Sequence, residues 1–106
     1  PSIKDIVLSK ELNVDCVEIH TGKISNIIKA KKKYANELNR IKKCSILANK
    51  LNIEVHAGHG LDYKTTKILS KIKEIEEFNI GHFIIGESIF LGLSSVIKKF
   101  KRIINN

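Results

Sequence analysis

An α/β fold with a parallel sheet is predicted by three features of the 106-residue sequence. Short segments alternate apolar and polar residues, as half-buried strands do. Longer segments repeat apolar residues at helical spacing. The two kinds of segment take turns along the chain, and glycine-containing turns follow the strand-like ones. This alternation favours parallel strands joined by right-handed helical crossovers.

The first half of the chain is expected to form a helix, a strand and a second helix. A helix is predicted over residues 2–12, because Ser2 is a capping residue ahead of an apolar-periodic stretch. Residues 15–20 alternate like a strand. A long helix over 27–51 follows, with Asn52 as its expected stop. Its apolar stripe consists of Tyr34, Leu38, Ile41, Cys44, Ala48 and Leu51.

The second half repeats the pattern. Residues 53–57 are expected to form the second strand, 65–77 a helix and 78–81 a short third strand. Residues 82–90 fit either a continued strand or a short helix. The inner face of the helix over 65–77 carries Ile68, Leu69, Ile72 and Ile75. The final helix follows Gly92, is capped by Ser94 or Ser95, and carries Val96, Ile97, Phe100, Ile103 and Ile104.

Each expected strand has one apolar face and one polar face. The polar faces carry Cys16, Glu18, His20, Glu54, His56 and Asn79. A doubly wound sheet covered on both sides would bury these groups at a cost of several kcal/mol each. A (β/α)8 TIM barrel accounts for them better, because its strands face helices on one side and a lumen on the other. A small antiparallel α+β sheet with one solvated face is the alternative, but regular helical crossovers do not suit it.

The chain is shorter than a complete barrel. A barrel needs about 250 residues, whereas this sequence offers three strands and begins without a methionine. Residues 1–106 are therefore interpreted as the C-terminal half of a single barrel domain whose N-terminal half is absent.

The excess of basic residues allows a second reading, a nucleic-acid-binding module. The net charge is +8, but only two of the 19 basic residues are arginine, and no aromatic residues are interleaved with them. The densest run, residues 31–33, falls in the expected long helix and is interpreted as a solvated face. No nucleic-acid partner is predicted.

The sequence also bears on compartment and membrane contact. No apolar run approaches the roughly 18 residues of a membrane span, so no membrane partner is predicted. The two cysteines, Cys16 and Cys44, cannot form a disulfide scaffold and are expected to be small core residues. A reducing cytoplasm is the expected compartment.

Candidate functional residues gather where the three strands end. The segments 18–22, 56–61 and 79–82 each combine histidine with glycine. In a barrel these ends share the catalytic face. Gly60 and Gly81 suit a phosphate site, where backbone N–H groups approach the ligand, although tight turns would also need glycine.

Individual side chains on this face admit more than one role. His59, between two glycines, suits a general acid or base. Glu18 is either a catalytic carboxylate or half of a structural ion pair. A zinc site that combines these histidines with His20, His56 and His82 is disfavoured, because two of the four lie on turns and no aspartate ends a third strand.

Three motifs together resemble one enzyme family. They are Glu-Ile-His-Thr-Gly at 18–22, His-Ala-Gly-His-Gly-Leu at 56–61 and Phe-Asn-Ile-Gly-His-Phe-Ile-Ile-Gly at 78–86. Their order and spacing are similar to those of the last three strands of pyridoxine 5′-phosphate synthase, a family of vitamin B6 biosynthesis. The resemblance covers the whole chain and the C-terminal half of the family's length.

The resemblance implies a cytoplasmic homo-oligomeric TIM-barrel transferase, an octamer, with no metal and no organic cofactor. The implied reaction condenses 1-deoxy-D-xylulose 5-phosphate with 3-amino-2-oxopropyl phosphate to pyridoxine 5′-phosphate, phosphate and water. By motif, His59 resembles the proton donor and Glu18 the carboxylate that stabilises a cationic transition state. Gly60, Gly81 and His82 resemble residues that hold the amino-ketone phosphate.

The chain departs from the family pattern in two places and lacks part of the catalytic set. His56 stands where asparagine is common, and Glu87 stands where arginine is common. The family's other acid–base groups belong to the absent half, so this chain alone is expected to be inactive. Another phosphate-binding barrel enzyme, an isomerase or an aldolase, is the alternative; an aldolase would need a lysine at a strand end, which no expected strand carries.

Overall fold

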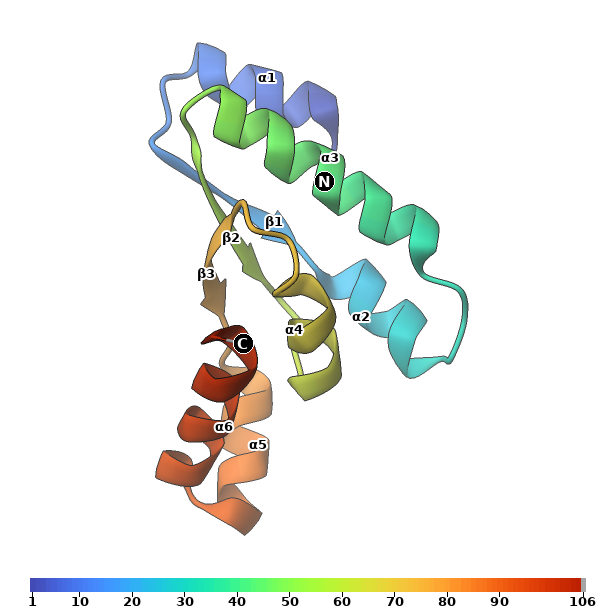
Figure 1. Cartoon of the computed structure of the whole chain (residues 1–106), viewed down its shortest axis with the longest axis vertical. Helices are drawn as coiled ribbons and strands as arrows, with labels where there is room; N and C mark the ends of the chain where they lie inside the picture. The colour runs from blue at the N-terminus through green and yellow to red at the C-terminus, as the bar shows by residue number, and fades with distance from the viewer. Residues whose placement is uncertain (106) are drawn as a thin grey trace.

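The computed structural model describes residues 1–105 and shows strands alternating with helices (Figure 1). Along the chain the elements are α1 (Ile3–Glu11), β1 (Cys16–His20), α2 (Gly22–Lys29), α3 (Ala35–Lys50), β2 (Glu54–Gly58), α4 (Tyr63–Leu69), β3 (Ile75–Asn79), α5 (His82–Leu91) and α6 (Leu93–Asn105). None of the helices in this part of the chain has the length and apolar character needed to cross a bilayer.

The three strands form one parallel sheet in the order β1–β2–β3. His20 pairs with Gly58, and Gly58 pairs with Asn79, so the carboxyl ends of all three strands lie in one row. The predicted α/β fold with a parallel sheet is confirmed. The arrangement is consistent with part of a (β/α) barrel.

Helices cover the apolar face of this sheet. Ile19, Val55 and Ala57 are buried there, whereas Glu18 and Glu54 on the opposite face are exposed, as the alternation predicts. Helix α3 packs on β2, and α1 and α2 contact α3 (Figure 1). The side chains that are fully buried in this core include Ile24, Ile41, Cys44, Val55 and Leu69.

The C-terminal helices are joined to the body by aromatic rings. Tyr63 of α4 lies with its ring centroid 4.9 Å from that of Phe83 in α5 and 4.7 Å from that of Phe100 in α6. Lys99 places its ammonium 4.0 Å from the Tyr63 ring. Burial raises the pKa of the Tyr63 phenol. These contacts fix the start of α5, where β3 ends.

Caps at the helix starts follow the local sequence. The Ser2 hydroxyl accepts a hydrogen bond of 3.1 Å from the backbone N–H of Asp5, which confirms the predicted cap. Asp62 caps α4 in the same way, accepting 2.8 Å from the N–H of Thr65. Asn52, with φ of 59°, ends α3 as expected.

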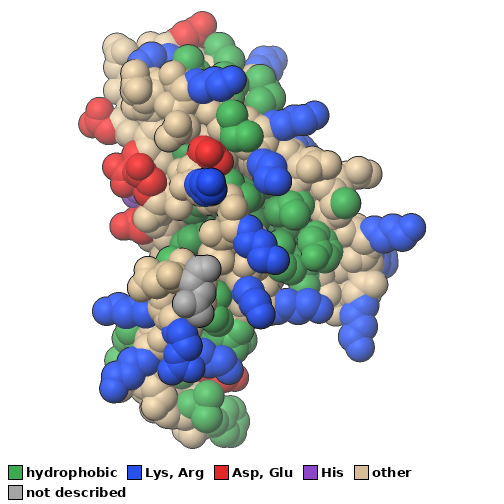
Figure 2. All heavy atoms as spheres, in the orientation of Figure 1, with side chains coloured by type: hydrophobic (Ala, Val, Ile, Leu, Met, Phe, Trp, Pro, Cys, Tyr) green, Lys and Arg blue, Asp and Glu red, His purple; other side chains and the backbone are tan. Residues whose placement is uncertain are grey.

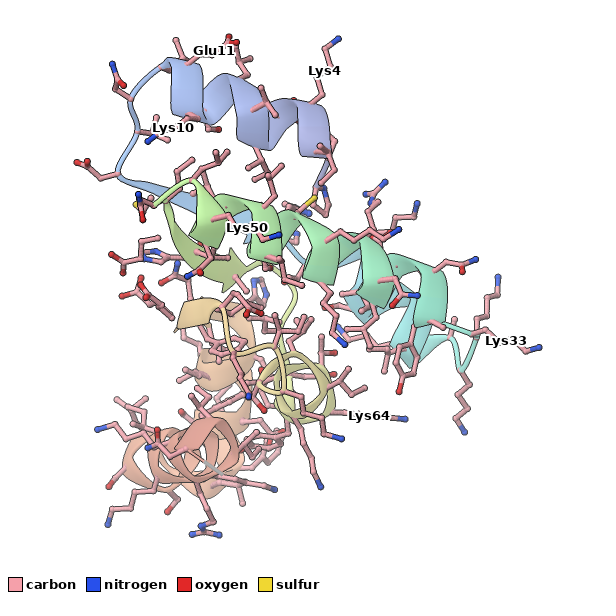
Figure 3. All side chains as sticks on the ribbon, turned by 45° about the horizontal axis from the view of Figure 1, so that its top comes forward. Lys4, Lys10, Glu11, Lys33, Lys50 and Lys64 are labelled. Atoms are coloured by element: carbon pink, nitrogen blue, oxygen red, sulfur yellow. The ribbon has the colours of Figure 1, made fainter. Side chains whose placement is uncertain are left out.

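The predicted helix over 27–51 is wrong: it is two helices, α2 and α3. Lys31 adopts φ of 56°, a left-handed conformation that ends α2. The chain needs this break, because α2 begins directly after β1 and a straight continuation would carry α3 away from the sheet. The lysines at 31–33 therefore lie in an exposed loop rather than on a helix, and Lys33 points into solvent (Figure 3).

The predicted helix over 65–77 is wrong at its C-terminal end. Helix α4 ends at Leu69, and Ile75 opens β3 instead of closing a helix. Ile72 and Ile75 are both buried. Two buried residues at this spacing fit a continuous helix, and they fit a turn followed by a strand equally well. Residues 82–90, compatible with strand or helix, are helical, and the final helix begins at Leu93 rather than after a serine cap.

The two cysteines do not share one environment, contrary to expectation. Cys44 is buried in the core, and burial raises the pKa of its thiol. Cys16 is exposed on the polar face of β1, so its prediction as a core residue is wrong for this chain.

Candidate active site

The carboxyl edge of the sheet brings together the residues singled out on sequence grounds. Glu18 lies on β1, His59 and Gly60 follow β2, and Gly81 and His82 follow β3. Because the strand ends are in register, three segments far apart in the chain meet at this edge.

A cavity of about 220 Å³ lies beside this edge. Its lining consists of Lys29, Gly60, Leu61, Asn79, Ile80, Gly81, His82 and Phe83. All three glycine and histidine positions matched to phosphate binding therefore line one cavity. Gly81 is the N-cap of α5, and the first N–H groups of a helix have no acceptor within it.

Lys29 is a lining residue that sequence reasoning missed. It stands in the last turn of α2. Among the residues that line the cavity it is the one lysine or arginine. No local motif marks it, since it is one lysine among many. Only the folding of α2 against the β2–α4 loop brings it to the cavity.

The carboxylate of Glu18 is held by neutral groups. Its Oε1 accepts a hydrogen bond of 2.7 Å from the side-chain amide of Asn79 on β3. The carboxylate lies over Gly58, where a Cβ would overlap it. Within residues 1–105 no ion pair involves Glu18, so it is not half of a structural ion pair here. An exposed, unpaired carboxylate can stabilise positive charge on a ligand.

His59 is exposed at the start of the β2–α4 loop. Its φ is 92°, in the left-handed region that few non-glycine residues adopt. Its ring is stacked on that of His20, with centroids 4.2 Å apart and planes inclined by 26°. The buried Thr21 hydroxyl lies 2.7 Å from the carbonyl oxygen of His59 and 2.9 Å from that of Gly58. The imidazole is thus presented at the edge by His20, the last residue of β1, and by Thr21, the N-cap of α2.

His56 lies away from this edge, on the polar face of β2. Its Nε2 is 3.0 Å from Glu54 and its Nδ1 is 2.9 Å from Glu77. The hydrogen bond to Glu54 and, secondarily, the charge of Glu77 raise the pKa of His56. No group of three or more metal-ligating side chains gathers within the described residues, and the four histidines do not converge there.

Two further features bear on the alternatives. Glu87 does not line the cavity, so the carboxylate found where the family commonly has arginine is kept out of the candidate phosphate site. None of the three strands described carries a lysine, as a Schiff-base aldolase of this architecture would require.

A parallel α/β sheet that gathers acid–base groups and a small cavity at its carboxyl edge is the arrangement of an enzyme acting on small molecules. Comparison with known proteins gives the particular family. Residues 1–106 match the model of the family described as "Pyridoxal phosphate biosynthesis protein PdxJ". The chain belongs to this family, as the three motifs indicated.

Curated relatives carry the name pyridoxine 5′-phosphate synthase. The protein of Pelagibacter ubique is 70% identical over 105 residues, which cover 99% of this chain and 44% of that protein. The protein of a Sulfurihydrogenibium species is 46% identical over 106 residues, covering 100% of this chain and 43% of the relative. The protein of Zymomonas mobilis is 46% identical over 101 residues, covering 95% and 39%. The chain thus spans less than half the length of these relatives.

Proposed function

We propose that residues 1–106 are the C-terminal half of a single TIM-barrel domain in a full-length pyridoxine 5′-phosphate synthase. Family membership and the three parallel strands support this. The reaction is the transferase condensation of 1-deoxy-D-xylulose 5-phosphate with 3-amino-2-oxopropyl phosphate. By the same resemblance, the enzyme is a cytoplasmic homo-oligomer, an octamer.

The observation that carries the proposal is the shared cavity of Gly60, Gly81 and His82. These residues come from the β2–α4 loop and from the start of α5, and the motif match assigns all of them to binding the amino-ketone phosphate. Lys29 lines the same cavity, so an ammonium and the N-terminus of α5 both favour a dianion. The amino-ketone phosphate is the ligand proposed for this cavity.

The edge groups supply two further functions. His59 donates a proton during the condensation, since its imidazole is exposed at the carboxyl edge and histidine is the side chain that most often acts as a general acid. Glu18 stabilises the cationic iminium-like transition state, because its carboxylate is fixed by Asn79 and forms no ion pair within residues 1–105. The remaining acid–base steps belong to the half of the barrel outside this chain.

Replacement of His59 in the full-length protein tests the proposal. His59→Ala is expected to lower kcat for pyridoxine 5′-phosphate formation by about 10²- to 10⁴-fold while the fold persists. The matched control is His56→Asn. His56 lies on β2, the strand that precedes His59, and contacts two glutamates, so this variant should keep nearly all activity. Near-normal turnover by His59→Ala would remove it from the mechanism.

The intact mass of the protein in its source cells tests the extent of the domain. A mass at least about twice 12.0 kDa is expected, since a complete barrel needs about 250 residues. A cellular mass near 12.0 kDa would leave the catalytic set incomplete and would overturn the enzymatic proposal.

A further inference from the structure

We propose that His20 is a positioning residue that holds the imidazole of His59 in place through ring stacking. The proposal rests on the function given to His59 above and extends it to a residue with no assigned role. The backbone of His59 does little to fix the orientation of its own side chain.

The loop that carries His59 is held at its carbonyls but not at its ring. His59 stands between Gly58 and Gly60 with φ of 92°. The Thr21 hydroxyl fixes the carbonyl oxygens of Gly58 and His59 at 2.9 and 2.7 Å, and the Thr21 N–H donates to Gly58 at 2.9 Å. Within residues 1–105, hydrogen bonds to histidine rings are made by His20 and His56, and neither ring nitrogen of His59 makes one. The ring orientation must come from packing.

That packing comes from His20, the last residue of β1. The two rings lie 4.2 Å apart and are nearly parallel. Stacked contact between flat aromatic rings is favourable beyond the area it buries. His20 is in turn fixed, because its Nδ1 accepts a hydrogen bond of 3.3 Å from the backbone N–H of Gly22 at the start of α2.

Gly22 is the condition for this stack. A Cβ at this position would lie 2.6 Å from Cε1 of His20 and 2.8 Å from Cδ2 of His59. Both distances are shorter than real Cβ atoms tolerate, so any side chain would push the rings apart. The three residues therefore form one unit. The backbone of Gly22 holds the ring of His20, and the ring of His20 holds the ring of His59.

The chemistry of the stack suits a proton donor. Nδ1 of His20 accepts the hydrogen bond from Gly22, so this nitrogen is already engaged within the unit. His20 presents the flat face of its ring to His59. His20 orients His59 and leaves the ring nitrogens of His59 free for the substrate.

The test uses the full-length protein with three replacements of His20. His20→Phe keeps a flat ring, whereas His20→Leu fills similar space without one and His20→Ala leaves it empty. We expect kcat to fall roughly 10- to 100-fold in the leucine and alanine variants with KM nearly unchanged. A misplaced proton donor slows the chemical step without weakening substrate binding. The phenylalanine variant should stay within about threefold of the parent, because stacking is restored.

A spectroscopic readout separates stacking from general stability. The ring protons of His59 should show an upfield ring-current shift by NMR in the parent and in His20→Phe, and should lose it in His20→Leu. Unchanged kcat in His20→Leu, an inactive His20→Phe, or no ring-current shift in the parent would each overturn the positioning role. If His59→Ala itself were fully active, the proposed function would fail instead, so the two failures are distinguishable.

Discussion

Strand β2 carries a histidine within its length and another just past its end, and the two differ in every partner. His56 uses both ring nitrogens on carboxylates, at 3.0 Å from Glu54 and 2.9 Å from Glu77. His59 is held by a ring stack and by the Thr21 hydroxyl on its backbone carbonyl. The contrast teaches that residue type and strand do not define a catalytic candidate. A ring fixed in position with its nitrogens unoccupied is available for chemistry, whereas a charge-paired ring is not.

The same contrast holds for charge at a larger scale. Lysines and arginines spread over several elements on the face drawn in Figure 2 instead of gathering on one. Lys29 differs from its neighbours because it lines the cavity, whereas the lysines at 31–33 stand in an exposed loop. The basic residues are therefore mostly solvated surface, and Lys29 is the lysine that lines the cavity proposed for the phosphate.

Among replacements outside the His20–His59 pair, the largest effect is expected from adding a methyl group beneath Glu18. Gly58→Ala would place a Cβ in the volume of the carboxylate and displace it from Asn79. We expect kcat of the full-length enzyme to fall about 100-fold, since a fixed charge near the reacting atoms is moved. Gly86→Ala is the control, because nothing lies within 4 Å of a Cβ there. Equal kinetics for the two variants would remove Glu18 from its proposed role.

A smaller effect is expected at the cavity. Lys29→Ala should raise KM for the amino-ketone phosphate about tenfold, the worth of one charge-assisted hydrogen bond, with a smaller change in kcat. Lys31→Ala removes a charge of the same kind from the exposed loop two residues on and should leave KM unchanged. Identical KM values in steady-state assays of both variants would show that Lys29 does not contact the phosphate.

The smallest effect is expected from the paired histidine. The hydrogen bond to Glu54, and then the charge of Glu77, raise the pKa of His56 in the fold above its ordinary value of about 6.5. The stabilisation from this pairing is therefore fully present below about pH 6.5 and is lost as pH rises through the folded pKa. It is small, because the two glutamate side chains remain 52% and 56% exposed.

Thermal unfolding across pH measures this contribution. The Tm difference between the parent and His56→Asn should be greatest near pH 6 and should shrink in alkaline buffer. Glu11→Gln, which alters an exposed carboxylate at the end of α1, serves as a control without this pH dependence. If the Tm difference between the parent and His56→Asn grew with pH instead, protonated His56 paired with the two glutamates would not be the stabilising form.

Much of the fold could be predicted from local pattern. The alternation in β1 and β2 correctly placed Ile19, Val55 and Ala57 in the core and left Glu18 and Glu54 outside it. The helix end at Asn52 followed from a residue that tolerates positive φ. The ends of β1 and β2 were predicted to within one residue, whereas the third strand, expected over 78–81, ends at Asn79. The sequence still indicated that Glu18, His59 and Gly81 belong to one edge.

The remaining features depended on contacts between distant segments. Ile75 could belong to a helix or a strand by spacing, and its pairing with Val55 across the sheet decided the matter. The break at Lys31 is imposed by the need to bring α3 back onto β2. Periodicity records which residues are buried, but not what buries them.

The sequence by itself determined the strand faces, the parallel α/β architecture and the family, because these depend on residue order within short segments. Tertiary structure alone decided that Lys29 lines the cavity, that Asn79 holds Glu18 and that His20 stacks on His59. Each of these contacts joins residues from different elements. Their geometry is set by sheet register and helix packing, which no local pattern encodes.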